Sequence, residues 1–505
     1  MADNDQTVTQ QEEEQEETPV VTETEPVPEP EDEEQDDEEI SRSLFGRKEI
    51  LTAVDTITKQ NVVDVLHKAL GVHYFNASQI DYLYRYMRGQ QPILFRKKKV
   101  RPDICNKIVE NHASEIAQFT SGYFLGEPVT YVRRGERAGS ADQVSTLNDY
   151  MFFEDKSSHD KEMSTWMAIC GLGYRMSLPD KGADTDESPF ELDTPDPRTT
   201  FVVYHSGFGH KRMMGVRIIF REKTPGNLTK LYCGYTSTHY FEVEDGVLKV
   251  WKPHLLDDIP IFEYRLNMAR MGSFEPAVPL LDAINNIMSN RVDGLEQFVQ
   301  SFLKFKNCEV DEDQVKKLGK LGAIFIKSTE GLDSDVDLIC QELNQEQTQT
   351  LVDYLYDQVL VICGMPTTTK GGHSTSDTGQ AVFLRDGWSQ CEARAKDTEL
   401  LFKRSEKEFL KLVLHIIRQS NTDFDLSLSE IECKFTRRQH DNMANKTSAL
   451  LAMLQAGLAP EVAIATSGLF NDPMDVTEQS KEYLKKWEPV TLKLPEEPDE
   501  VNDDE

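Results

Sequence analysis

Proline is absent from Thr367 to Ala459, so a helix in that stretch can continue without the break that a proline imposes. Its apolar residues recur every three or four positions, which places them on one face of an α-helix. They are Ala381, Leu384, Trp388, Cys391, Ala395, Phe402, Phe409, Val413 and Ile416. The pattern predicts a helix over residues 378–420, about 60 Å long at about 1.5 Å per residue. A helix of this length is typical of a subunit that spans part of an assembly.

Two shorter helices with one apolar and one polar face are predicted earlier in the chain. The first covers residues 278–303, with Leu280, Ile284, Ile287, Arg291, Leu295, Phe298 and Phe302 on one face and Asp282, Asn286, Ser289, Asp293, Glu296 and Gln300 on the other. The second covers residues 344–363, with Leu351, Leu355, Val359 and Ile362 on one face and Glu346, Gln349, Asp353 and Asp357 on the other. Glycines punctuate residues 304–343, which we expect to be partly β. Residues 364–377 are rich in Gly, Ser and Thr and are predicted to form a loop.

The rest of the chain mixes both kinds of element. Residues 41–277 carry helical patterns at 61–70 and 101–125, followed by strand patterns at 201–204, 215–220, 231–235, 239–243 and 247–251. Asp245-Gly246 predicts a tight hairpin turn between the last two strands, because this pair tolerates positive φ. Residues 421–437 are expected to form a connecting strand region. It leads to a small helical unit at 438–487, where Pro460 suits a first helical position and Asp475 to Glu478 fits a capping box. The fold class is therefore mixed α+β, mainly helical.

Charge is concentrated at the two ends of the chain. Residues 1–39 contain 18 acidic and no basic residues, and residues 496–505 contain 7 acidic and no basic residues. The remaining 63 acids face 55 bases, so the body is only mildly acidic. Such ends bury too little apolar surface to fold, and we predict disordered acidic tails over residues 1–40 and 488–505. The N-terminal tail either aids solubility or tethers a basic partner, such as a scaffolding protein.

No pattern in the sequence points to catalysis. The eight cysteines are scattered, with no C-x-x-C pair and no grouping with histidines, so we expect reduced, mostly buried thiols and no metal site. The phosphate-binding G-x-x-x-x-G-K-[ST] loop and the H-E-x-x-H, G-x-S-x-G and G-x-G-x-x-G motifs are absent. No signal segment and no run of 18 apolar residues occurs. We therefore expect no enzyme activity, no cofactor and no membrane association.

A basic run covers Arg96 to Arg101 and includes three consecutive lysines. It either binds DNA or an acidic tail of a neighbouring subunit, or it is a solvated linker between helices. No aromatic residue interrupts it, and Pro102 follows it. Composition alone leaves both alternatives open.

Several short motifs, in one order along residues 45–485, resemble those of portal proteins from siphovirus-type tailed phages. The most distinctive are Asn106-Lys107-Ile108-Val109-Glu110-Asn111 and Gly122 to Tyr131. The others are Phe201 to Tyr204, Ile259 to Tyr264, Phe274-Glu275-Pro276, Leu281-Asp282-Ala283, Glu296 to Val299, Phe435-Thr436-Arg437 and Phe470 to Pro473. Each motif is weak alone, but their common order favours the resemblance. The long acidic N-terminal tail is not part of it.

The resemblance implies a ring, twelve-fold in the virion, with wing, stem, clip and crown around an axial channel. Residues 41–277 and the helix 378–420 would form the wing, 278–303 and 344–363 the stem helices, and 304–343 the clip. Residues 364–377 would be a tunnel loop that projects toward DNA, and 438–487 the crown. Its function would be DNA packaging, genome retention and ejection at a capsid vertex.

The implied mechanism is passage of double-stranded DNA without sequence-specific binding. We expect Glu346, Asp353 and Asp357 to line the channel, because like charges repel a polyanion weakly within a screening length of about 8–10 Å. Lys370, Gly371, Gly372 and His373 would supply a sparse, movable contact in the tunnel loop. Alternatively, the acids only solvate an outer surface and Lys370 is an ordinary loop lysine.

The partners follow from the resemblance alone. They are other copies of the chain, the large terminase subunit, a head-completion adaptor, and the scaffolding and major capsid proteins. The ring would be assembled in the host cytoplasm and stay in the virion. Two other hypotheses remain: a different structural virion protein, and a DNA-processing enzyme such as a nuclease.

Overall fold

The chain divides into two units, Met1–Ser43 and Leu44–Glu505. The computed structural model describes residues 46–99, 102–135, 137, 139–180, 182, 187–224, 227–299, 302–306, 335–339, 345–367, 387–437, 443–470 and 473–484. All of them belong to the second unit. Both predicted acidic tails lie outside the described residues.

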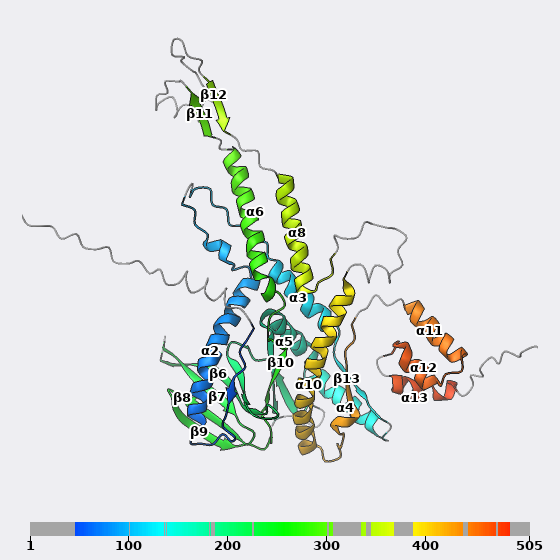
Figure 1. The fold of residues 1–505 in the computed structure, drawn as a ribbon. Coiled ribbons are helices and arrows are strands. Elements are labelled where there is room, and N and C mark those ends of the chain that lie inside the picture. The colour runs from blue at the N-terminus through cyan, green and yellow to red at the C-terminus, as the bar shows by residue number, and fades with distance from the viewer. Residues whose placement is uncertain are drawn as a thin grey trace, which may run out of the picture. The chain divides into compact units, whose positions relative to one another are not determined.

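A six-stranded sheet and one helix form the first layer of the fold (Figure 1). The strand order is β1-β5-β6-β7-β8-β9, with β1 parallel to β5 and every other pair antiparallel. The bounds are β1 (Leu51–Thr52), β5 (Thr200–His205), β6 (Arg212–Thr224), β7 (Asn227–Tyr235), β8 (His239–Glu244) and β9 (Val247–Pro253). Apolar residues of α2 (Val62–Met87), including Val62 and Leu66, pack on Phe201, Val203 and Met214 of the sheet. The five predicted strands are therefore confirmed.

The predicted hairpin turn between β8 and β9 is also confirmed. Asp245 has φ of 50° and Gly246 has φ of 74°, so both central residues are left-handed. This conformation matches the twist of an antiparallel pair, and the Asp-Gly sequence tolerates it at low cost.

A three-stranded sheet of order β10-β3-β4 carries the long helix α10 (Trp388–Ser420). Its strands are β3 (Leu172–Pro179), β4 (Phe190–Asp193) and β10 (Ile261–Arg265). Phe402 and Phe409 of α10 are fully buried in the same core as Phe262 and Tyr264 of β10. The predicted long helix is present with 33 residues, about 50 Å at about 1.5 Å per residue.

Where α10 begins differs from the prediction of residue 378. Gly387 precedes the helix with φ of 80°, a left-handed conformation that an α-helix cannot continue through. The helix therefore starts at Trp388, and residues 378–386 lie outside the described part of the chain.

Helices and a two-stranded ribbon complete this core. The helices are α3 (His112–Phe124), α4 (Ser140–Phe153) and α5 (Lys156–Cys170), with short 3-10 turns η1 (Pro92–Phe95), η2 (Glu275–Ala277) and η3 (Leu428–Glu430). Strand β2 (Thr130–Arg133) pairs antiparallel with β13 (Ile431–Lys434), as expected for a connecting strand region at 421–437. The predicted helix 101–125 is wrong over residues 102–111, which are not helical.

Two antiparallel helices and a strand pair form the next part (Figure 1). They are α6 (Val278–Val299), β11 (Phe302–Lys306), β12 (Asp335–Ile339) and α8 (Gln345–Cys363), with β11 antiparallel to β12. The predicted second helix is confirmed almost to the residue. The first ends earlier than predicted, because residues 302 and 303 belong to β11.

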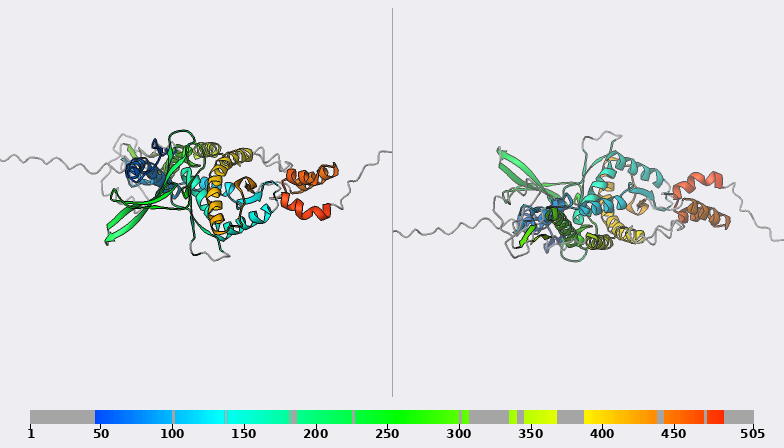
Figure 2. Two further views of the ribbon diagram at one scale, coloured as in Figure 1. Left: turned by 90° about the horizontal axis from the view of Figure 1, so that it is seen from below. Right: turned by 90° about the horizontal axis from the view of Figure 1, so that it is seen from above.

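Three helices end the described chain, where α12 packs on both α11 and α13 (Figure 1). Figure 2 shows this end of the chain, in orange and red, from below and from above. They are α11 (Met443–Gln455), α12 (Pro460–Ser467) and α13 (Pro473–Leu484). Pro460 occupies the predicted first position of α12. The predicted capping box is wrong, because α13 begins at Pro473 and Asp475 already lies in its first turn. The mixed, mainly helical α+β fold class is confirmed.

Candidate functional site

The helices α6 and α8 run side by side in opposite directions. η2 leads directly into α6 and contacts α8, whereas the far half of α6 meets the start of α8. There Arg291 donates from Nη1 to Gln349 Oε1 at 2.6 Å, and Gln349 Nε2 donates to Asp353 Oδ1 at 2.7 Å. These two hydrogen bonds connect α6 to α8 near the start of α8.

Glu346, Asp353 and Asp357 lie on one face of α8, since residues seven and four positions apart recur on the same side of a helix. Glu346 and Asp353 are exposed, and Asp357 is half-buried. Asp353 is the member of this face that accepts the hydrogen bond from Gln349. The three residues therefore lie on one face of α8, as the sequence predicts.

The buried face of α8 differs from the predicted apolar face. Val359 is fully buried as expected, and Val352 is buried as well, but Leu351 stays 47% exposed and Ile362 39% exposed. The spacing of apolar residues predicts that Leu351 and Ile362 share one face of the helix with Val359. Exposed apolar residues therefore remain on α8 beside the face that packs within the chain.

Part of the polar face predicted for α6 is buried within the protein. Ser289 and Asp293 are buried against residues 106–108, not exposed to solvent. Asp293 forms an ion pair with Arg96 at 3.1 Å and another with Lys98. Burial raises the pKa of Asp293, but the Lys98 and Asn106 contacts outweigh burial and lower it. Two cations of the basic run therefore neutralise a buried carboxylate.

Sequence reasoning missed this packing of residues 106–110 on α6. The available signal was the recurrence of Asn285, Ser289 and Asp293, three small polar residues four positions apart on one helix. Polar residues at this spacing either face water or form hydrogen bonds with backbone groups of a neighbouring segment.

The predicted loop residues Lys370, Gly371, Gly372 and His373 lie outside the described residues. The two ends of the segment that contains them are described. A Cβ atom placed on Gly387 would lie 3.8 Å from the carbonyl oxygen of Met365. Both ends of residues 368–386 therefore meet at the junction of α8 and α10.

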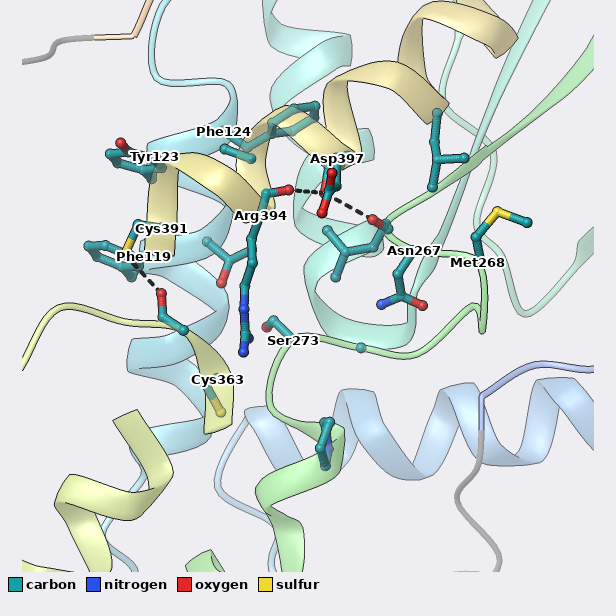
Figure 3. Close-up of a pocket in the computed structure, with 18 of the residues that line it drawn as sticks. Phe119, Tyr123, Phe124, Asn267, Met268, Ser273, Cys363, Cys391, Arg394 and Asp397 are labelled. Carbon is teal, nitrogen blue, oxygen red and sulfur yellow. Dashed lines mark hydrogen bonds between the residues drawn. The ribbon is translucent and has the colours of Figure 1, made fainter. Parts of the chain in front are cut away.

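A cavity of about 590 Å³ lies at this junction (Figure 3). Apolar side chains of α3, α8 and α10 line it, together with the loop that follows β10. Cys391 Sγ lies 2.8 Å from the carbonyl oxygen of Gly364, and Arg394 Nη1 donates to the carbonyl oxygen of Ile362 at 2.9 Å. These contacts attach the end of α8 to the start of α10.

The thiols at this cavity are poor nucleophiles. Burial raises the pKa of Cys363 to about 12 and that of Cys391 to about 11, so both stay protonated near neutral pH. The six described cysteines are free, and five of them are buried, as predicted. Among the described residues, no group of three or more His, Cys, Asp or Glu residues could hold a metal ion. In that part of the chain, no helix is long and apolar enough to cross a membrane.

Comparisons with known proteins show the family of this chain and structures that are similar to it. The family described as "Phage portal protein, SPP1 Gp6-like" matches residues 67–487. No curated protein matches the chain. A chain from the neck of an empty GTA particle is 12% identical, with a TM-score of 0.43 over 71% of this chain and 90% of that chain. A chain from the virion of a native gene transfer agent (GTA) particle is 12% identical, with a TM-score of 0.42 over 77% of this chain and 93% of that chain.

Proposed function

Because this chain belongs to the family of SPP1 Gp6-like phage portal proteins, it is a structural protein that forms the channel at a capsid vertex of the virion, and we propose that α6 and α8 form the wall of that channel. The ring-shaped oligomer follows from the family. Twelve copies in the virion are part of the proposal.

The parts of the chain take the following roles in this proposal. Residues 41–277 and the long helix within 378–420 form the wing, residues 278–303 and 344–363 the stem, and residues 304–343 the clip. Residues 364–377 form the tunnel loop, and residues 438–487 the crown. The antiparallel pairing of α6 and α8, with the strand pair β11–β12 between them in sequence, supports this division.

The observation that carries the proposal is the acidic face of α8. Glu346 and Asp353 are exposed one above the other on a helix that is paired with α6 along its length. Repeated around a ring, this face forms columns of negative charge. A protein that binds DNA tightly neutralises phosphates with Lys and Arg. An acidic wall repels the phosphates weakly, so DNA passes and does not stay bound.

Lys370 and His373 supply a movable contact to the DNA in this proposal, and Gly371 and Gly372 let the loop that carries them follow the duplex. The meeting of the two ends of residues 368–386 beside α8 supports this role, because a loop anchored there starts at the foot of the proposed wall.

ATP hydrolysis then belongs to a separate protein, the large terminase subunit, which docks on the clip. A head-completion adaptor replaces it after packaging, while scaffolding and major capsid proteins surround the wing. The chain itself has no catalytic role and no cofactor. Assembly takes place in the host cytoplasm. Family membership and the absence of phosphate-binding motifs from the sequence support these assignments.

Reversing the charge of the α8 face tests the proposal. We expect the double substitution Glu346→Lys and Asp353→Lys to leave rings intact but to lower the yield of packaged DNA at least about tenfold, because added cations hold the phosphates. The defect should weaken as salt is raised, since salt screens the contact. Ring formation is checked by electron microscopy and packaging by nuclease-protected DNA.

The control is Asp149→Lys, which reverses an exposed acid on α4. It should package DNA at the level of the unmodified protein. Equal packaging by the double variant and the control would contradict an acidic channel wall on α8.

A further inference from the structure

Residues 106–110 lie along α6 and donate alternate backbone N–H groups to it. Asn106 N donates to Asp293 Oδ1 at 2.7 Å, Ile108 N to Ser289 Oγ at 2.9 Å, and Glu110 N to Asn285 Oδ1 at 2.8 Å. The segment therefore runs antiparallel to α6. Every second residue of the segment forms one hydrogen bond, and its acceptors on α6 are four residues apart.

The two repeats match for a geometric reason. Two residues of an extended chain advance about 6.6 Å, and four residues of an α-helix advance about 6 Å. Side chains at every fourth helical position therefore stay in step with alternate N–H groups of an extended segment. Asn285, Ser289 and Asp293 are all buried by this contact, so their polar atoms depend on it for hydrogen bonds.

Charged and amide groups hold both ends of the segment. At one end, Arg96 and Lys98 pair with Asp293, and Asn106 Nδ2 donates to the same carboxylate at 3.0 Å. At the other end, Asn111 Nδ2 donates to the carbonyl oxygen of Met87, the last residue of α2, at 2.8 Å. The segment thus connects α6 to the helix that covers the six-stranded sheet.

The same segment then continues to the second helix. Residues 112–115 form the first turn of α3, where the His112 ring centroid lies 4.3 Å from that of Tyr356 on α8. Tyr356 donates its hydroxyl to Glu115 Oε1 at 2.9 Å. Ten consecutive residues therefore contact α6 first and α8 second.

We propose that residues 106–115 act as a spacer that sets the separation of α6 and α8 and so the width of the channel. The inference rests on the proposed function, in which these two helices form the channel wall. The direct contact of Arg291 with Gln349 joins the two helices near the start of α8. The spacer joins the same part of α6 to Tyr356, seven residues further along α8. Ser289 and Tyr356 are its positioning residues, one on each helix.

The test removes one attachment at a time. Ser289→Ala deletes the acceptor of the Ile108 N–H group, Ser289→Thr keeps a hydroxyl there, and Tyr356→Phe deletes only the hydroxyl that binds Glu115. Rings of each variant are imaged by electron microscopy at a resolution that places α6 and α8. Hydrogen exchange at the Ile108 amide is measured on the same samples, together with nuclease-protected DNA.

We expect Ser289→Ala to exchange at the Ile108 amide about tenfold faster, to change the distance between α6 and α8, and to package less DNA, while Ser289→Thr behaves like the unmodified protein. Tyr356→Phe should move α8 relative to α6, while hydrogen exchange at the Ile108 amide stays normal. If Ser289→Ala does not fold, the helix separation in Tyr356→Phe rings tests the spacer. Unchanged helix separation and packaging in Tyr356→Phe and in any folded Ser289→Ala ring would overturn the spacer. Failure of the unmodified protein to form rings would instead overturn the proposed function and the inference with it.

Discussion

His73 is a buried side chain whose charge state the fold controls. It lies on α2 with 2% of its surface exposed, its ring stacked on Phe201 at 4.4 Å between centroids. Its Nε2 lies 3.1 Å from the carbonyl oxygen of Arg198, so the neutral ring donates there. Burial lowers the pKa of His73 to about 4, although the Arg198 carbonyl partly opposes the shift. The folded protein therefore resists protonation at this position.

The stability of the protein should consequently fall as the pH drops from about 6.5 to about 4. In that window the unfolded chain binds a proton at His73 and the folded chain does not, so unfolding becomes easier by up to about 3 kcal/mol. Above pH 6.5 both states are neutral at this residue and the effect vanishes. His73→Gln keeps a donor without the titration and should flatten this part of the pH profile. Thermal unfolding midpoints at pH 7.5 and pH 4.5 measure it, and equal slopes in both proteins would contradict the assignment.

At the scale of elements, a buried ionic cluster fixes α10 on the three-stranded sheet. Arg175 of β3 lies 2.9 Å from Glu406 of α10, and Lys156 of α5 lies 3.2 Å from the same carboxylate. Asp160 pairs with both cations, and Tyr264 donates to Glu406 at 2.6 Å. Burial raises the pKa of Glu406, but the two cations outweigh it and hold the pKa well below its usual range. The two acids thus balance the two cations.

Glu406→Ala should destabilise the protein by about 3–5 kcal/mol, because it leaves buried cations without their partner. The matched control is Glu408→Ala, two residues along α10, where an exposed carboxylate pairs with Arg212 at 3.0 Å. Its loss should cost at most about 1 kcal/mol, since solvent screens exposed pairs. Urea unfolding followed by the fluorescence of the tryptophans compares the two. Similar midpoints would show that the cluster does not hold α10.

At the scale of the whole molecule, the paired helices α6 and α8 carry exposed apolar residues. Leu295 of α6 and Leu351, Tyr354 and Ile362 of α8 are all at least 39% exposed in the single chain. Large apolar side chains gathered on one structural unit are typical of a contact surface between subunits. A ring of the portal family supplies such neighbours on both sides of every subunit.

Leu351→Glu should therefore block or weaken ring assembly without unfolding the subunit, because it places a charge where a neighbour packs. Sedimentation velocity separates rings from monomers, and thermal unfolding of the monomer checks its fold. Leu255→Glu is the control, since Leu255 is 81% exposed but lies between β9 and β10, where its carbonyl oxygen accepts from Gln419 near the end of α10. Normal rings from Leu351→Glu would exclude this face of α8 from the subunit contact.

Local patterns in the sequence predicted the elements whose signals lie within a few residues. The Asp245-Gly246 turn, helix 344–363 and most of the long helix α10 depend on backbone conformation and on side-chain spacing along one helix, so no distant residue is needed to predict them. The short motifs and their order also predict the portal family, and the match over residues 67–487 confirms it.

The prediction of a helix at 101–125 is wrong over residues 106–110 because their backbone N–H groups donate to acceptors 175 to 187 positions away in the chain, and not to carbonyl groups of a helix. The same packing explains why Ser289 and Asp293, which the spacing places on a polar face, are buried: backbone N–H groups of residues 106 and 108 donate to them. Amphipathic spacing shows that a helix has two faces, but it does not say which partner covers each one. That choice is made by tertiary packing, since a buried polar group must find its partner wherever the fold brings one.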